Sequence, residues 1–273
     1  MRKRTIEAKL QPAELETEND RQFVTALHRG LEILRAFRPT DHSGLGNREL
    51  AERTGLPNST VSRLTFTLWK LNYIIYDENT GRYRMGVPVL SLGYACLAGM
   101  QIRETAQIHM QELADKCGDG VLVALGGRDD MTMTYLACAR STGIISLQLS
   151  VGSRISLSRS AMGRAYIAST SEDERNEILT KIDERSDADH AKLMRDSIDE
   201  ARKQIADRGF YINVGGWQPD VNSVAVPFRS PDGNTPMMSF NLGGHAYNLP
   251  KEKLESELGP KLVELVNKVG RVR

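Results

Sequence analysis

The sequence is poor in cysteine and has no long apolar run. Three cysteines occur among 273 residues, at Cys96, Cys117 and Cys138. Their odd number and wide spacing argue against a disulfide framework and a Cys-x-x-Cys zinc site, and favour reduced thiols. No apolar stretch approaches the roughly 20 residues of a membrane-spanning helix, and no secretory signal is recognised. We therefore expect a cytoplasmic protein with no membrane partner.

Sequence signatures of common enzymes are also missing. There is no Gly-x-x-x-x-Gly-Lys phosphate loop and no dinucleotide fingerprint. Ser160 and Cys138 are candidate nucleophiles, but neither has a His and Asp at a recognised spacing, and Ser160 lacks the Gly-x-Ser-x-Gly elbow. The five histidines are scattered. We expect no catalytic residues and no cofactor, and nothing in the sequence requires a metal.

The charge is unevenly distributed along the chain. The net charge of the whole chain is +1. Its length of 273 residues allows one large or two modest domains, and a hydrophobic content of 40% is enough to form their cores. Residues 21–85 hold ten Lys and Arg against six Asp and Glu, whereas residues 86–273 hold 22 against 24. A basic front part favours contact with nucleic acid. Residues 1–20 combine MRKR with a Glu-rich stretch and predict a flexible tail, although MRKR is also suited to phosphate contacts.

The tract Gly46–Leu71 predicts two helices joined by a tight turn. Gly55 suits the left-handed end of the first helix, and Pro57 suits the first turn of the second. In the second helix, apolar residues recur at steps of three and four and predict a stripe that faces a core. This stripe comprises Val61, Leu64, Leu68 and Leu71.

The opposite side of the second helix carries hydroxyl groups and a guanidinium. Short hydrogen-bonding groups and an arginine on a helix supported by another helix are suited to phosphates and base edges. A helix-turn-helix that binds double-stranded DNA is the sharper interpretation, and an ordinary helical hairpin is the alternative. The candidate DNA-binding residues are Arg48, Asn58, Ser59, Thr60, Ser62, Arg63, Thr67, Arg82 and Arg84.

A predicted β-hairpin follows directly. Residues 73–76 and 82–85 have strand character and flank a loop of turn formers, 77–81. Alternation places Arg82 and Arg84 on one face, as in the wing of a winged helix, where they would meet the DNA backbone or minor groove. A helix over 23–37, with Val24, Leu27, Leu31 and Leu34 as its stripe, completes a winged helix-turn-helix domain over residues 21–86.

Residues 87–117 predict a connector helix whose pattern slips around Gly99. A small winged domain cannot cover all of its apolar residues. Either the connector pairs with its copy in a second subunit, as in regulators that read two half-sites, or it packs on its own C-terminal domain. The apolar positions are Val89, Leu92, Cys96, Met100, Ile102, Ala106, His109 and Leu113.

Residues 118–273 predict an α+β domain in which helices flank an antiparallel sheet. Strand patterns come first, helical patterns follow, strands return, and a helix ends the chain. The predicted strands are 121–127, 131–139, 144–150, 210–214, 222–228 and 237–242, and the predicted helices are 161–169, 172–182, 190–208 and 251–269.

Five segments resemble the IclR (isocitrate lyase regulator) family of bacterial transcription regulators. ALHRGLEILRAF, ELAERTGLPNSTVSRLTFTLWKLNYI and TGRYRMG resemble its N-terminal domain, and SLSRSAMGRAYIAS and GFYINVGGWQPDVNSVAVPF resemble segments of its ligand domain. The similarity extends from about Arg21 to Arg273. It implies a GAF/PAS-like C-terminal sensor domain that binds an effector and oligomerises, and a dimer or dimer of dimers on operator DNA.

The segment before residue 161 is a candidate anion site. Backbone N–H groups at a helix N-terminus favour a carboxylate, although a plain N-cap at Ser160 is the alternative. The resemblance implies that a small organic acid is enclosed there and by the late strands. Asn213, Ser223 and Asn241 stand where the family often has an acid, a cysteine and a serine, and with nearby Trp217 they suggest a different, aromatic acid. A packing role for Trp217 is the alternative. The implied effector-binding residues are Ser160, Ala161, Met162, Gly163, Asn213, Ser223, Asn241 and Gly243.

Three functions follow from these patterns. The first is an effector-responsive transcriptional regulator of a catabolic pathway. The second is an architectural DNA-binding dimer without a ligand. The third is a metabolite-acting enzyme with an accessory DNA-binding head. The sequence favours the first, and leaves the effector, the operator and the sign of regulation unassigned.

Overall fold

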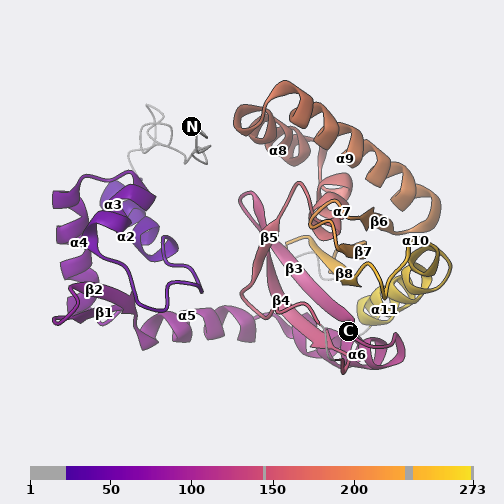
Figure 1. Ribbon diagram of the computed structural model, residues 1–273, viewed down its shortest axis with the longest axis horizontal. Coiled ribbons are helices and arrows are strands. Elements are labelled where there is room, and N and C mark those ends of the chain that lie inside the picture. The colour runs from indigo at the N-terminus through magenta and orange to yellow at the C-terminus, as the bar shows by residue number, and fades with distance from the viewer. Residues whose placement is uncertain (1–22, 144–145, 231–235, 272–273) are drawn as a thin grey trace. The chain divides into compact units, whose positions relative to one another are not determined.

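A computed structural model describes residues 23–143, 146–230 and 236–271 of the chain. These residues form two compact units that divide between Ala98 and Gly99 (Figure 1). The predicted flexible tail, residues 1–20, lies outside the described residues. Each unit has its own hydrophobic core, and the α+β class with an N-terminal helix-turn-helix is confirmed.

The first unit is a winged helix-turn-helix. Its small core is formed by Ile33, Leu45, Leu50, Leu56 and Val61. The two wing strands pair in an antiparallel hairpin, and a further bridge joins Leu45 to Tyr83. The elements are α2 (Thr25–Arg35), α3 (Asn47–Thr54), α4 (Asn58–Lys70), β1 (Ile74–Asp77), β2 (Arg82–Met85) and α5 (Val87–Ala98).

The turn between α3 and α4 follows the predicted chemistry with one shift. Gly55 ends α3 with φ of 72°, the left-handed region in which glycine has no steric penalty. Pro57 stands one residue before α4, as its N-cap, rather than inside its first turn. Arg53, near the end of α3, stabilises this turn. It donates hydrogen bonds of 2.6 and 2.8 Å to Asp41 and one of 2.9 Å to the carbonyl of Ala36.

Two predicted apolar stripes differ from the observed burial. Leu71 is 58% exposed because α4 ends at Lys70, and Thr65 takes a buried place on that helix instead, with its hydroxyl donating to the carbonyl of Val61. In α2 the buried residue is Ile33, whereas Leu27 and Leu31 are at least half exposed. The apolar face of α2 is therefore directed away from the core of this unit.

The predicted connector contains two helices instead of one. The break falls at Gly99 and Met100, where the apolar pattern slips, between α5 and α6 (Gln101–Lys116). Helix α6 buries Ala106, Met110 and Leu113 in the core of the second unit. Helix α5 buries none of its residues. The two halves of the segment therefore differ: α6 packs on its own domain and α5 remains uncovered.

The described part of the second unit contains a six-stranded antiparallel sheet. The strand order is β5-β4-β3-β8-β7-β6, so the early strands meet the late ones where β3 pairs with β8. The predicted strand at 144–150 is wrong for 146–150, which are not in a strand; the short strand begins at Arg154. The strands are β3 (Leu122–Asp129), β4 (Thr132–Arg140), β5 (Arg154–Ser156), β6 (Tyr211–Val214), β7 (Val221–Phe228) and β8 (Met238–His245).

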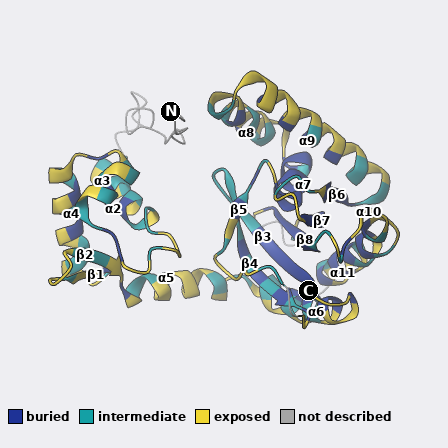
Figure 2. Cartoon of the chain, viewed as in Figure 1, coloured by how far each residue is buried: buried dark blue, intermediate teal, exposed yellow. Residues whose placement is uncertain are grey.

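Helices cover both faces of this sheet. On one face α6 and α11 pack over apolar residues such as Val224 and Phe240. On the other face α7 lies against β7 and β8, and α8 and α9 pack outside it. Figure 2 shows α7 as almost wholly buried, whereas α8 and α9 have exposed outer sides. The remaining helices are α7 (Ala161–Ser169), α8 (Glu172–Arg185), α9 (Ala188–Arg208), α10 (Lys251–Lys253), a π-helical turn (Leu254–Leu258) and α11 (Gly259–Arg271).

Candidate functional site

The outer side of α4 is open to solvent, as expected for a recognition helix. Its inner side is held in the unit by Val61 and Thr65, which are fully buried. Within the described part of the chain, the guanidinium of Arg63 makes no hydrogen bond or ion pair, so its donors are free. The exposed residues of the predicted set on this helix are Asn58, Ser59, Ser62, Arg63 and Thr67, and Thr60 is half-buried.

Two of these hydroxyl groups already have an intramolecular partner. Asn47 at the start of α3 donates a hydrogen bond of 2.8 Å to the hydroxyl oxygen of Ser62, which links the two helices of the motif. The hydroxyl of Thr67 donates to the carbonyl of Arg63. Ser62 retains its own O–H as a donor, whereas the Thr67 oxygen retains acceptor capacity.

The other predicted arginines are placed differently from one another. Arg82 is half-buried, bonds the carbonyl of Gly44, and lies 2.7 Å from a carboxylate oxygen of Glu49, so it ties the wing to α3. The pKa of Glu49 is lowered because its carboxylate accepts hydrogen bonds from the Gly46 N–H and from Arg82. Arg48 and Arg84 are exposed, and with the described residues they make only surface ion pairs, to Glu52 and Asp77.

Strand register brings the predicted effector residues together on the face of the sheet that carries α7. A row is defined as the residues that pair directly with one another from strand to strand across the sheet. The side chains of one row lie on the same face of the sheet. The first row is Arg140, Leu122, Gly243, Ser223 and Asn213. The adjacent row on the same face is Cys138, Ala124, Asn241, Ala225 and Tyr211.

Three of these residues converge closely. A Cβ atom added at Gly243 would lie 3.0 Å from Cβ of Ser223 and 3.4 Å from Nδ2 of Asn241. Ser223 and Asn241 are 8% and 6% exposed, and their side chains make no hydrogen bond to any described residue. Their polar atoms are nevertheless not sealed from solvent, so water or a ligand can meet their donors and acceptors.

The segment before α7 is an N-cap that also anchors the neighbouring strand. The hydroxyl of Ser160 accepts a 3.1 Å hydrogen bond from the Gly163 N–H and donates one of 2.6 Å to the carbonyl of Ser156. Asn213 donates to the carbonyl of Arg159, and the Arg159 side chain donates to the carbonyl of Trp217. The plain N-cap interpretation of Ser160 is therefore the observed one.

The glycine and methionine of that segment serve packing. Gly163 lies so close to the Leu157 carbonyl that an added Cβ would be 1.9 Å from it. The Met162 sulfur would be 2.4 Å from a Cβ at Gly126, so Met162 covers β3 closely. Ala161 is fully buried beside them. These three residues therefore fix α7 on the sheet above the two rows.

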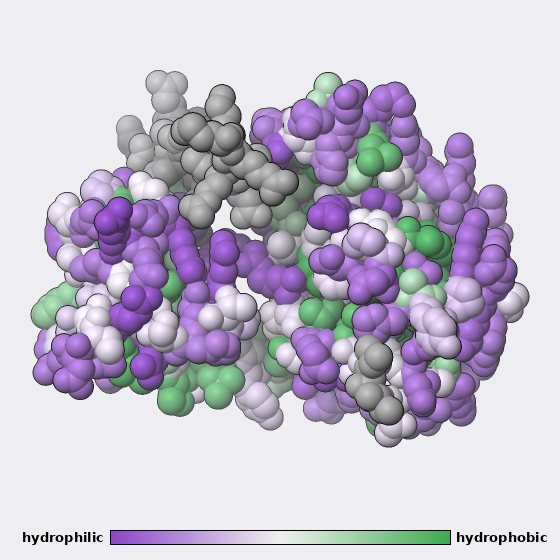
Figure 3. Space-filling view, viewed as in Figure 1, coloured by the Kyte–Doolittle hydropathy of each residue, from purple (hydrophilic) through white to green (hydrophobic). Residues whose placement is uncertain are grey.

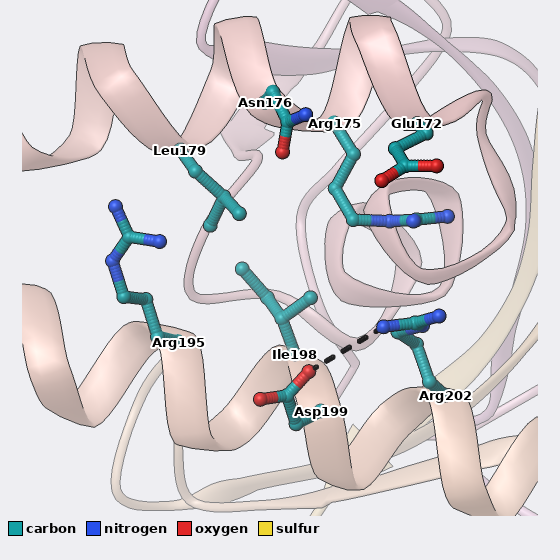
Figure 4. A pocket seen from close by; sticks show the side chains of 8 residues that line it. All are labelled: Glu172, Arg175, Asn176, Leu179, Arg195, Ile198, Asp199 and Arg202. Atoms are coloured by element: carbon teal, nitrogen blue, oxygen red, sulfur yellow. Dashed lines mark ion pairs between the residues drawn. The ribbon is translucent and has the colours of Figure 1, made fainter.

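A cavity of about 290 Å³ lies elsewhere, between α8 and α9 (Figure 4). Its charges are largely satisfied: Arg202 pairs with Asp199, Arg195 with Asp183, and Arg175 donates to carbonyls at the end of α7. None of the predicted effector residues lines it. The lining residues are Glu172, Arg175, Asn176, Leu179, Arg195, Ile198, Asp199 and Arg202.

Residues 23–143, 146–230 and 236–271 contain neither a metal-binding cluster nor a membrane-spanning helix. In these ranges, no three side chains of His, Cys, Asp or Glu gather closely enough to hold a metal ion. None of the helices there combines the length and the apolar character needed to cross a bilayer.

Family comparisons decide what the two units are. Residues 26–78 match the IclR helix-turn-helix domain, and residues 94–271 match the bacterial transcriptional regulator IclR C-terminal domain. The chain belongs to the IclR family. It is therefore a transcriptional regulator of the IclR type that binds DNA through its N-terminal helix-turn-helix. The homologues are transcriptional regulators, which are not enzymes.

Three known proteins are similar to this chain in sequence or in fold. The chain is 30% identical over 254 residues to the HTH-type transcriptional regulator TsaQ1/TsaQ2 of Comamonas testosteroni, covering 92% of this chain and 89% of that protein. It is 42% identical to an IclR family transcriptional regulator from Brucella abortus of known crystal structure, with a TM-score of 0.85 and coverage of 96% and 97%. An IclR homolog from Microbacterium hydrocarbonoxydans, crystallised with 4-hydroxybenzoate, shares the fold at 17% identity, with a TM-score of 0.64 and coverage of 90% and 95%.

The sequence pointed to Asn213, Ser223, Asn241 and Gly243, which the register brings together, but not to Arg140, which shares the row of Gly243, Ser223 and Asn213. The sequence did contain a signal for Arg140. It follows Cys138 by two residues in a predicted strand, and alternate residues of a strand lie on the same face of the sheet.

We expect Arg82→Ala and Arg84→Ala to have different effects. Arg82→Ala should destabilise the first unit by about 1–2 kcal/mol, because it removes half-buried hydrogen bonds that hold the wing. Arg84→Ala should change the free energy of unfolding by less than about 0.5 kcal/mol, since its ion pair is exposed. Urea denaturation of the two variants measures both values. Equal stabilities would show that Arg82 has no structural role.

Proposed function

We propose that this IclR-family chain is an effector-responsive regulator of a catabolic pathway and acts in the cytoplasm. The first unit reads operator DNA, and the second binds a small organic acid. The observation that carries the ligand part is the pair of side chains of Ser223 and Asn241 beside Gly243, which are largely covered yet make no hydrogen bond to any described residue. The ligand acts through a difference in affinity between forms of the protein that do and do not bind the operator.

The DNA-binding surface in this proposal is the outer side of α4. Ser59, Thr60, Ser62 and Arg63 enter the major groove, where a guanidinium recognises guanine through two hydrogen bonds. The free donors of Arg63 support this assignment. Asn58, Thr67 and Arg48 lie nearer the phosphates, and Arg84 of the wing meets the backbone or minor groove. Arg82 contributes mainly by holding the wing in place.

Exposed apolar residues of the first unit support self-association. Leu90 and Tyr94, one turn apart on α5, are 74% and 70% exposed. Figure 3 shows hydrophobic surface along the lower edge of this unit, where Figure 1 places α5. Contiguous exposed apolar surface is typical of interaction sites. We assign a second copy of the chain as its partner, because dimeric regulators present two heads to two half-sites. The exposed apolar residues near and on these two helices are Val24, Leu27 and Leu31 at α2, and Val87, Leu90, Leu92 and Tyr94 on α5.

The acid-binding site in this proposal is the row-bearing face of the sheet. The hydroxyl of Ser223 and the amides of Asn241 and Asn213 supply polar contacts, and Gly243 permits a close approach. The positive end of the α7 dipole favours a negative charge nearby. The 4-hydroxybenzoate bound by the Microbacterium protein is an available probe.

Arg63→Ala should weaken operator binding by about 1–3 kcal/mol, because it removes a contact to a base. A mobility-shift assay at fixed salt, with a fragment of the neighbouring promoter, measures the change. Arg202→Ala in the second unit is the matched control and should leave the affinity unchanged. Unchanged affinity in the Arg63 variant would reject its assignment to the major groove.

Leu90→Glu should shift the protein toward monomers without unfolding it, because the side chain is already exposed within one chain. Sedimentation velocity measures the oligomeric state, and circular dichroism reports the fold. Leu193→Glu, at a similarly exposed position on α9, is the control and should leave assembly unchanged. An unaltered oligomer in the Leu90 variant would remove α5 from the proposed interface.

Ser223→Val should abolish the influence of the acid on operator affinity and leave affinity without acid intact. Valine cannot hydrogen-bond, and its bulkier side chain also fills the space beside Gly243. A thermal-shift screen of small organic acids, 4-hydroxybenzoate included, first identifies a binder, since a ligand at one hundred times its Kd adds roughly 2.7 kcal/mol of stability. Ser256→Val, at an exposed position, is the control. A binder whose effect on DNA survives in the Ser223 variant would contradict this site, and the absence of any binder would favour an architectural role.

A further inference from the structure

Arg140 lies at the open end of the row that holds the proposed effector residues. It is the last residue of β4 and pairs with Leu122, which pairs with Gly243. Its side chain therefore leaves the sheet on the same face as Ser223 and Asn241. Cys138, two residues earlier on this face, packs in the cluster that includes Met162 and Trp217.

The guanidinium of Arg140 lacks a counter-charge. Its Nε is buried without a hydrogen-bond acceptor, and one Nη donates to the carbonyl of Leu149. Among the described residues it has no carboxylate partner. Arg208 also has a buried Nε without an acceptor, but its guanidinium pairs with Glu255 at 2.6 Å. Arg140 therefore combines an unused donor with an unneutralised charge.

A second unneutralised arginine borders the other end of this face. Arg164 of α7 is 6% exposed and donates 2.8 and 2.9 Å hydrogen bonds to the Ser158 carbonyl and the Tyr211 hydroxyl. No described carboxylate pairs with it. Strands β4 and β6 are four strand spacings apart, roughly 19 Å, so one small anion cannot bridge Arg140 and Arg164. Of the two, Arg140 is therefore the cation placed to meet a ligand at its end of the row.

The spacing of the strands indicates what kind of acid fits. One strand separates β4 from β8, so the backbones of Arg140 and Gly243 are roughly 10 Å apart. The side chains between them, Leu122 and Ala124, are apolar and are buried in the cluster that contains Met162 and Tyr166, so a ring seated on them displaces part of that cover. This order of a cation, an apolar stretch and the amide of Asn241 matches a flat molecule with a carboxylate at one end and a polar group at the other.

We infer that Arg140 binds the carboxylate of the effector, and that the effector is an aromatic monocarboxylate whose hydrogen-bonding substituent meets Asn241 and Ser223. This inference rests on the acid-sensing function proposed above and adds the recognition residue and the ligand class. Arginine binds a carboxylate through two parallel hydrogen bonds. The N-terminus of α7 is the weaker candidate, since Ser160 already occupies the Gly163 N–H.

Calorimetric titration of the full chain tests this assignment. The probes are benzoate, 4-hydroxybenzoate and 4-aminobenzoate, each paired with its neutral carboxamide, together with pyruvate and succinate as aliphatic acids. Wild-type protein should bind at least one aromatic acid at least tenfold more tightly than its amide. Arg140→Gln should weaken binding of that acid about tenfold to a hundredfold, the range of a charge-assisted hydrogen bond, and leave the amide unaffected.

Two further variants separate recognition from folding. Arg202→Gln, a surface arginine on α9, should bind the acid as wild type does. Arg140→Lys keeps the charge but cannot form two parallel hydrogen bonds, so its affinity should fall between those of wild type and Arg140→Gln. Loss of the melting transition without ligand would show that Arg140→Gln is unfolded, and the Arg140→Lys variant then tests the proposal instead. Wild-type affinity of Arg140→Lys for the acid would overturn bidentate recognition by Arg140.

The remaining outcomes separate the role of Arg140 from the acid-sensing function proposed above. Equal affinity of wild type and Arg140→Gln for the acid would overturn the role of Arg140 and leave acid sensing intact. Binding of pyruvate or succinate without any aromatic acid would overturn the ligand class alone. Failure of every acid to bind wild-type protein would overturn the acid-sensing function and the inference with it.

Discussion

The register of the antiparallel sheet decides which polar groups of the second unit remain without partners. Pairing of β3 with both β4 and β8 puts Arg140 in one row with Gly243 and Ser223. Apolar residues of the intervening strand, Leu122 and Ala124, lie between these polar ends. A shift of one residue in any pair would turn these side chains to the opposite face. The proposed recognition of an acid thus depends on backbone pairing between segments more than 100 residues apart.

The first unit separates support from recognition in a similar way. Arg53 and Arg82 are engaged with Asp41 and Glu49, and they hold the turn and the wing. Arg63, on the outer side of α4, has no such partner among the described residues. Because the supporting charges are paired within the unit, the outer side of α4 is left for DNA. The break at Gly99 and the uncovered α5 set the limits of this unit, and self-association through α5 would place two such heads on one operator.

Local patterns in the sequence predict much of this architecture. The helix at 161–169 has the bounds expected from its pattern, and the turn at Gly55 follows from glycine's tolerance of positive φ. Patterns that depend on distant partners are less informative. The apolar stripe of α2 predicts burial, but Leu27 and Leu31 are exposed. The pattern of 144–150 predicts a strand, but 146–150 are not in a strand. Arg140 escapes detection because its neighbours, Leu122 and then Gly243, come from other parts of the chain.

A crystal structure of the full chain with 4-hydroxybenzoate, or with another aromatic acid that binds in solution, tests the central claim most directly. The account predicts that the ring lies over Leu122 and Ala124, with its carboxylate on the guanidinium of Arg140 and its far substituent against Asn241 and Ser223. An acid seated in the cavity between α8 and α9, or held by α7 with Arg140 unengaged, would contradict it.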